Sequence, residues 1–182
     1  YEFGGIYLDS DVELVKPLDE LLQYKAFVGH ESVRTLSMGI LGSEKGHPWV
    51  KMLLDYYNGR SFVQSDGMLD MRPNTDIVTA LTEEAYGVNF EKHPDIIGDG
   101  VKVFPQVVFS PPIIFTGWAE TTPDTIAIHY FAGAWRPVQQ RKLQYRKRYL
   151  QLIKYCMRKL FGVTLYNGIM SCKRQLTNTG KS

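Results

Sequence analysis

The feature that most constrains this chain is a short apolar run followed at once by two acids, in the stretch GGIYLDSDVE that begins at Gly4. The apolar run, residues 6–8, predicts a buried strand. Asp9 and Asp11 follow, and if the extended geometry continues, their side chains point to the same side. Both carboxylates then face one place at the carboxyl end of a strand, where open α/β sheets bind their ligands.

Two carboxylates at one place have few chemical options. They repel each other unless a cation lies between them or one is protonated. Ligand sets made of oxygen suit Mg²⁺ or Mn²⁺, which commonly bridge a protein carboxylate to a substrate phosphate. The simpler alternative is a solvated turn in which Asp9 acts as a cap.

The wider stretch GGIYLDSDVELVKPLDELL, Gly4 to Leu22, resembles the DXD segment of a family of sugar transferases. This family includes capsular polysaccharide glycosyltransferases and the Golgi initiating mannosyltransferases. The paired glycines, the aromatic-containing strand, the Asp-Ser-Asp and the sequel Lys-Pro-Leu at 16–18 occur in the family's order and spacing. The resemblance implies an α/β fold of GT-A type, with a Rossmann-related mixed sheet flanked by helices. It also implies that an amino-terminal portion carrying much of the nucleotide-base pocket precedes residue 1.

Periodicity predicts the other elements of this fold. Short apolar runs predict strands at 26–29, 36–41, 101–105 and 107–109, the last two as edge pieces around Pro105. Helices are expected at 18–23, after Pro48 with Ser43 as a candidate N-cap, and at 77–86. Gly39 lies inside one predicted strand and suggests a close backbone approach or a bulge.

A late strand, IAIHYFAGAW at 126–135, is predicted to carry His129 to its end. Taken alone, His129 reads as a hydrogen-bonded core residue. It resembles, however, the family's late histidine before a small residue and a tryptophan, which implies that it completes the metal site of Asp9 and Asp11. Two carboxylates and one imidazole suit Mn²⁺ better than Mg²⁺.

The resemblance also implies a set of residues at the nucleotide sugar. Gly133 and Ala134 allow the backbone to approach a diphosphate closely, and Arg136 could hold its oxygens. Trp135 is either a core aromatic or a wall of this site. The implied set is Asp9, Ser10, Gly133, Ala134, Trp135 and Arg136.

Acidic and amide side chains at 64–76 form a second candidate group. A solvated loop is one reading of this polar segment, and an acceptor-binding loop is the other. The junction Asn74 to Asp76, just before the predicted helix, resembles the family's loop-to-helix junction. Asp70, Asn74 and Asp76 are the candidate acceptor residues.

Charge divides the chain into two parts. All 19 acids and 9 of the 21 Lys and Arg lie in residues 1–135, and the other 12 basic residues lie in 136–182. We therefore expect a catalytic domain at 1–136 and a basic helical tail at 137–182, with its main helix at 138–161. That helix either packs on the acidic body or contacts an anionic membrane surface. No recognised motif accompanies the charge to indicate nucleic acid. Two cysteines outside any zinc spacing predict free thiols.

The resemblance, together with the acidic pair, implies a retaining, divalent-metal-dependent glycosyltransferase with Asp9 and Asp11 as catalytic residues. Its donor would be a UDP- or GDP-sugar and its acceptor a glycan or lipid-linked molecule, as in capsular polysaccharide synthesis. The expected location is cytoplasmic, at the inner face of the membrane, or the Golgi lumen in a eukaryote. A non-catalytic carbohydrate- or nucleotide-binding module of the same fold and a metal-dependent phosphohydrolase are the alternatives.

Overall fold

The computed structural model describes residues 1–113, 118–133, 149–150, 153 and 156. The chain divides into two compact units, one of Tyr1–Pro112 with Ala119–Ala132 and one of Ile113–Trp118 with Gly133–Ser182. In the second unit, Tyr149, Leu150, Ile153 and Cys156 are helical and exposed. The remainder of the predicted basic helix lies outside the described residues.

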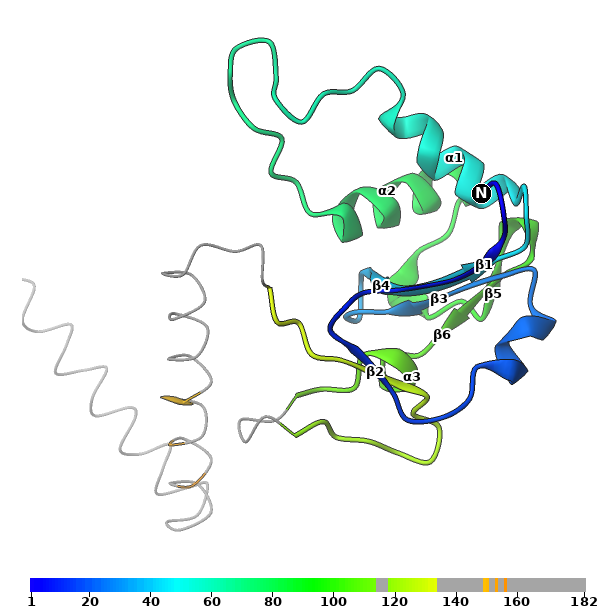
Figure 1. The fold of residues 1–182 in the computed structure, drawn as a ribbon, viewed down its shortest axis with the longest axis vertical. Coiled ribbons are helices and arrows are strands. Elements are labelled where there is room, and N and C mark those ends of the chain that lie inside the picture. The colour runs from blue at the N-terminus through cyan, green and yellow to red at the C-terminus, as the bar shows by residue number, and fades with distance from the viewer. Residues whose placement is uncertain (114–117, 134–148, 151–152, 154–155, 157–182) are drawn as a thin grey trace, which may run out of the picture. The chain divides into compact units, whose positions relative to one another are not determined.

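The first unit alternates short strands with helices (Figure 1). In chain order, its elements are β1 (Gly5–Leu8), β2 (Val12–Leu14), η1 (Asp19–Gln23), β3 (Ala26–His30), β4 (Leu36–Ser43), α1 (Pro48–Tyr57), α2 (Asn74–Tyr86), η2 (Phe90–Lys92), β5 (Ile96–Ile97), η3 (Gly98–Gly100), β6 (Val101–Phe104), α3 (Gln106–Phe109) and β7 (Ala127–His129).

Five of the strands form one mixed sheet in the order β1-β4-β3-β6-β5. Only the β3–β6 pair is parallel, and the other neighbours run antiparallel. β2 and β7 form a separate antiparallel pair. A mixed sheet with flanking helices is the predicted α/β architecture of GT-A type, and this prediction is confirmed.

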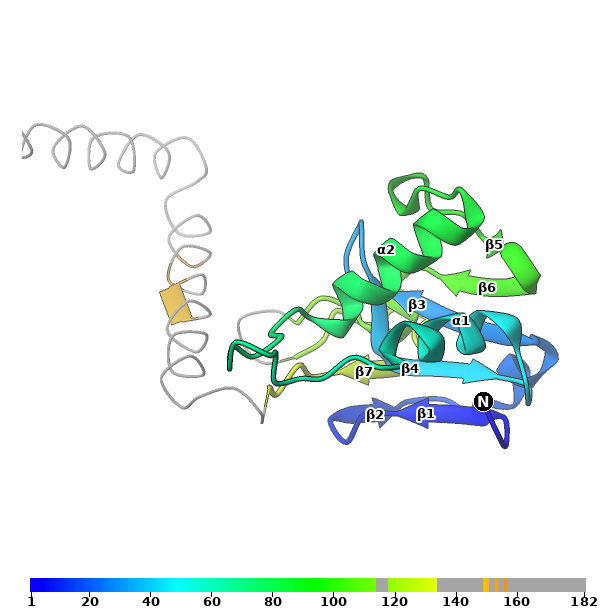
Figure 2. The same ribbon diagram turned by 90° about the horizontal axis from the view of Figure 1, so that it is seen from above.

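The central strand β3 separates two hydrophobic cores. Ala26 and Val28 belong to the core that includes Trp49 of α1 and Val78 of α2. Phe27, between them, points into the other core, which contains residues of η1, α3 and β7. Figures 1 and 2 show α1 and α2 covering one face of the sheet, and Figure 1 shows α3 on the opposite face. Because both faces are covered, every residue of β3 is buried.

Three local predictions are wrong. Residues 107–109 are helical because Pro105, which lacks an amide hydrogen, ends β6 and stands at the N-cap of α3. β6 itself lies between β3 and β5 rather than at an edge. The N-cap of α1 is the buried His47, whose side chain accepts a hydrogen bond from the backbone of Trp49, and Ser43 instead ends β4.

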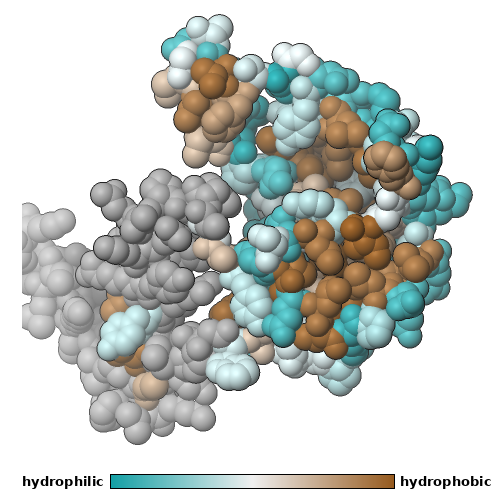
Figure 3. Space-filling view, in the orientation of Figure 1, coloured by the Kyte–Doolittle hydropathy of each residue, from teal (hydrophilic) through white to brown (hydrophobic). Residues whose placement is uncertain are grey.

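The strand that precedes the acids is also less buried than predicted. β1 is one of the two edge strands of the described sheet, and Tyr7 within it is 54% exposed. Apolar side chains gather on the surface over β1, β2 and η1 (Figure 3), where Leu14 and Leu22 are exposed as well. In the described part of the chain, no helix has the length and apolar character needed to cross a bilayer.

Removal of the Thr82 hydroxyl should destabilise the helical layer. The buried indole nitrogen of Trp49 donates to Thr82 Oγ1 at 3.0 Å, and this hydroxyl donates to the carbonyl of Val78 at 2.7 Å. Thr82→Val leaves a buried donor unpaired, and we expect a loss of about 1–3 kcal/mol in the free energy of unfolding by urea titration. Thr82→Ser keeps the hydroxyl and should lose much less. Equal losses in the two variants would contradict the hydrogen bond's role.

A second prediction concerns pH. Burial, and then the nearby charge of His93, lower the pKa of His30 from its ordinary value of 6.5. The unfolded chain therefore binds a proton at a pH where the native His30 does not. This contribution to stability is complete above about pH 6.5 and is lost as the pH falls through the lowered native pKa. We expect the free energy of unfolding to decline below pH 6.5, and to decline less steeply in His30→Gln.

Candidate metal centre

Asp9 and Asp11, the two acids of the DXD sequence, lie in a tight turn rather than in a continued strand. The backbone N–H of Asp9 donates to the carbonyl of Gly39 at 2.8 Å, which extends the β1–β4 pairing by one residue. The N–H of Val12 then donates to the carbonyl of Asp9 at 3.1 Å. This bond closes a turn through Ser10 and Asp11, so the extended geometry assumed from the sequence does not hold here.

His129 reaches the acids through the pairing of β2 with β7. In this ladder Val12 lies opposite His129. Two further backbone donors hold Asp11 beyond the end of the ladder. The N–H of Tyr130 donates to its carbonyl at 3.0 Å, and the N–H of Ala132 donates to Oδ2 at 2.7 Å. The late strand therefore holds both the backbone and the carboxylate of Asp11.

The three predicted ligands lie together, although His129 follows the two acids by more than 100 residues in the sequence. Nε2 of His129 is 3.4 Å from Oδ1 of Asp11 and 3.7 Å from Oδ2 of Asp9. One donor atom from each residue lies within 4.8 Å of the others. His129 is buried, and both acids are partly exposed.

This donor set fits a divalent cation. Bonds of about 2.1 Å place neighbouring ligand atoms about 3 Å apart and opposite ones about 4.2 Å apart. The observed separations are close to this range. Two carboxylates and one imidazole are ligands that suit Mn²⁺, and the side chains of both acids are partly exposed.

Tyr7 is a neighbour of this group to which the sequence assigned no role. Its hydroxyl donates to Oδ1 of Asp9 at 2.6 Å, and this hydrogen bond is the main cause of the raised pKa of Tyr7. The bond leaves Oδ2 of Asp9 facing His129. Tyr7 precedes Asp9 by two residues, so the period of a strand could have placed both on one side.

Packing surrounds the His129 ring on two other sides. Nδ1 is buried and has no hydrogen-bond partner among the described residues. A Cβ placed on Gly39 would lie 2.5 Å from this nitrogen, so the close approach predicted for Gly39 is confirmed. The ring of Phe131 stacks on the imidazole with centroids 4.0 Å apart and planes 31° apart. Phe131 has a φ of 51°, in the left-handed region.

The remaining residues predicted at the nucleotide sugar are only partly described. Ser10 is exposed at the tip of the turn between the two acids. Gly133 has a φ of 58°, a conformation that suits glycine. Ala134, Trp135 and Arg136 lie outside the described residues, so their expected contacts with a diphosphate stay predictions.

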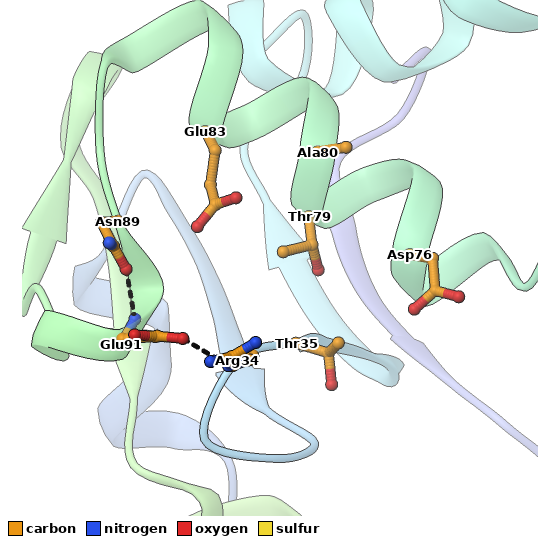
Figure 4. A pocket seen from close by; sticks show the side chains of 8 residues that line it. All are labelled: Arg34, Thr35, Asp76, Thr79, Ala80, Glu83, Asn89 and Glu91. Carbon is orange, nitrogen blue, oxygen red and sulfur yellow. Dashed lines mark hydrogen bonds and ion pairs between the residues drawn. The ribbon is translucent and has the colours of Figure 1, made fainter.

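The three candidate acceptor residues occupy different environments. Asp70 accepts two hydrogen bonds from the Arg72 side chain and one from its backbone N–H, and these lower the pKa of its carboxyl to about 2. Asn74 is the exposed first residue of α2. Asp76 lines a pocket of about 370 Å³ (Figure 4). The other lining residues are Arg34, Thr35, Thr79, Ala80, Glu83, Asn89 and Glu91. Asp70 and Asn74 are not among the residues that line this pocket.

The comparisons with known proteins found one local similarity of note. Over 50 residues the chain is 46% identical to inositol phosphoceramide mannosyltransferase 3 of Schizosaccharomyces pombe. This match covers 28% of the chain and 14% of that protein. No family model matches, and no solved structure matches. The similarity supports a relation to mannosyltransferase-like glycosyltransferases.

A methyl group at position 39 should disturb the site without unfolding the sheet. In Gly39→Ala the new Cβ collides with Nδ1 of His129, so the imidazole must leave the position in which Nε2 faces the acids. We expect affinity for Mn²⁺, measured by the loss of the free-ion electron paramagnetic resonance signal, to fall about tenfold or more. Gly67→Ala adds the same group in a surface turn where nothing lies within 4 Å; its φ of 82° makes this change locally strained, so it controls for strain away from the site and should bind Mn²⁺ as the wild type does. Unchanged affinity in Gly39→Ala would contradict the proposed ligand set.

Proposed function

We propose that this chain is part of a metal-dependent glycosyltransferase that transfers a sugar from a nucleotide-diphosphate sugar with retention of configuration. The observation that carries the proposal is the meeting of Asp9, Asp11 and His129, with donor atoms within 4.8 Å of one another. The local similarity to a mannosyltransferase supports the same class of reaction. Mannose is accordingly the first sugar to test, with UDP- or GDP-linked donors.

Electrostatics explains why such a site needs a cation. Departure of a nucleoside diphosphate builds negative charge on its phosphates, yet the two carboxylates would repel a diphosphate. A divalent cation, when bound, supplies positive charge that stabilises the leaving diphosphate. Asp9, Asp11 and the Nε2 atom of His129 would hold it, and Mn²⁺ suits this set better than Mg²⁺.

The chain's own contacts prepare this ligand set. The Tyr7 hydroxyl orients Asp9 through Oδ1, and the N–H of Ala132 orients Asp11 through Oδ2. Each carboxylate thus keeps its second oxygen toward His129. Because no nucleophile is assigned, we propose that the leaving phosphate itself accepts the proton of the acceptor hydroxyl.

The acceptor is proposed to be a glycan or a lipid-linked molecule. The related yeast protein is named for transfer to inositol phosphoceramide, a lipid acceptor, which makes a polyol headgroup the first candidate. Asp76, Glu83 and Asn89 line a pocket with the carboxylate and amide groups that bind sugar hydroxyls. We propose that the basic segment 138–161 contacts an anionic membrane surface.

The donor can be tested by thermal unfolding of the full-length protein with a panel of nucleotide sugars. Binding to the native state alone stabilises it by about 2.7 kcal/mol when the ligand is at 100 times its Kd. We expect the matching donor to raise the unfolding temperature only when Mn²⁺ is present. Stabilisation that is equal with Mn²⁺ and with a chelator would contradict the role of the cation.

Substitution of Asp11 tests the catalytic part of the proposal. Asp11→Asn removes a ligand charge and should lower Mn²⁺-dependent sugar transfer at least 100-fold, as loss of a key electrostatic group typically does. Asp19→Asn changes an exposed carboxylate in η1 and should leave transfer unchanged. Donor binding without any turnover would instead favour a non-catalytic module. Hydrolysis of simple phosphate esters would favour a phosphohydrolase.

A further inference from the structure

We propose that Phe131 is a positioning residue for two of the proposed ligands. Its ring orients His129, and its backbone conformation orients the carboxylate of Asp11. This inference rests on the proposed metal site and extends it to a residue that no comparison or motif assigns. Phe131 contacts the imidazole face, whereas the edge that carries Nε2 faces the acids.

Nδ1 of His129 lacks a hydrogen-bond partner among the described residues. A histidine that binds a metal through one ring nitrogen is usually oriented by a hydrogen bond from the other. In His129 that other nitrogen is buried. Gly39 lies against that nitrogen but makes no hydrogen bond with it. Among the described residues, the contacts that hold the orientation of the ring are therefore packing contacts.

Phe131 supplies the packing on the ring face. Its ring lies at a centroid distance of 4.0 Å and is tilted by 31°, so it covers the imidazole nearly face to face. Rotation of the imidazole about its Cβ–Cγ bond would drive its edge into this ring. The stacked ring of Phe131 and the close backbone of Gly39 together favour the imidazole orientation in which Nε2 points toward the acids.

The backbone of Phe131 supplies the second contact. Its φ of 51° lies in the left-handed region, which a bulky side chain adopts only when its surroundings impose it. In this conformation the next peptide presents the N–H of Ala132 to Oδ2 of Asp11 at 2.7 Å. The residue with the unfavourable backbone conformation therefore acts on two proposed ligands, because its ring contacts His129 and the peptide after it contacts the carboxylate of Asp11.

Three variants separate the ring from the backbone. Phe131→Tyr keeps the ring, whereas Phe131→Asn and Phe131→Gly remove it and still accept a left-handed conformation. The test measures Mn²⁺ binding to the full-length protein by electron paramagnetic resonance and checks that each variant still unfolds cooperatively on heating without metal. The expected result is a Kd near the wild-type value for Tyr, and a Kd about 10- to 100-fold higher for Asn and Gly, as for other groups that orient metal ligands.

The controls distinguish this inference from the function on which it rests. Phe3→Asn removes an equally large ring that is 94% exposed and should not change the Kd. If the wild type binds no Mn²⁺, the proposed metal site itself is wrong. If the wild type binds and the Asn and Gly variants bind equally well, the role of Phe131 is overturned. Loss of cooperative unfolding in both variants would also overturn it, because the ring would then support the fold rather than the site.

Discussion

The pairing of β2 with β7 is the interaction on which the candidate metal centre depends. It sets Val12 opposite His129, so the imidazole lies beside the turn that holds Asp9 and Asp11. A shift of one residue would turn every side chain of β7 to the other face. Each strand has only three residues, and backbone bonds beyond both ends fix the register. One runs from Val15 to Ile126, and another runs from Tyr130 to Asp11.

The sequence was most informative where a residue type carries its own chemistry. The role of His129 came from the family resemblance, whereas the acidic pair and the close backbone approach or bulge at Gly39 follow from residue type and pattern. The convergence of Asp11 and His129 does not, because a ladder of three residues has too little pattern to specify its partner. The strand predicted at 107–109 is wrong because Val, Val and Phe favour a strand by residue type, whereas Pro105 ends β6 and begins one helical turn.

Position in the sheet was equally hard to predict. The run at 6–8 is apolar enough for a buried strand, yet β1 is an edge strand of the described sheet. Periodicity reports which faces are apolar and not which neighbours a strand has. This edge position has a consequence for the site, because the strand that carries Tyr7 to Asp9 keeps one side open. Asp9 and Asp11 are partly exposed there, while His129 at the end of β7 is buried.

Two residues that contact the His129 imidazole, Gly39 and Phe131, are each of a type that their local backbone conformation disfavours. Gly39 leaves out a side chain inside β4, where glycine weakens a strand, and so makes room for Nδ1 of His129. Phe131 keeps a large side chain where the backbone favours glycine, and so covers the face of the same ring. Natural sequences are locally consistent except where function requires otherwise. Since both exceptions touch His129, the simplest physical account is that the fold gives up local stability to fix the direction of its Nε2 atom.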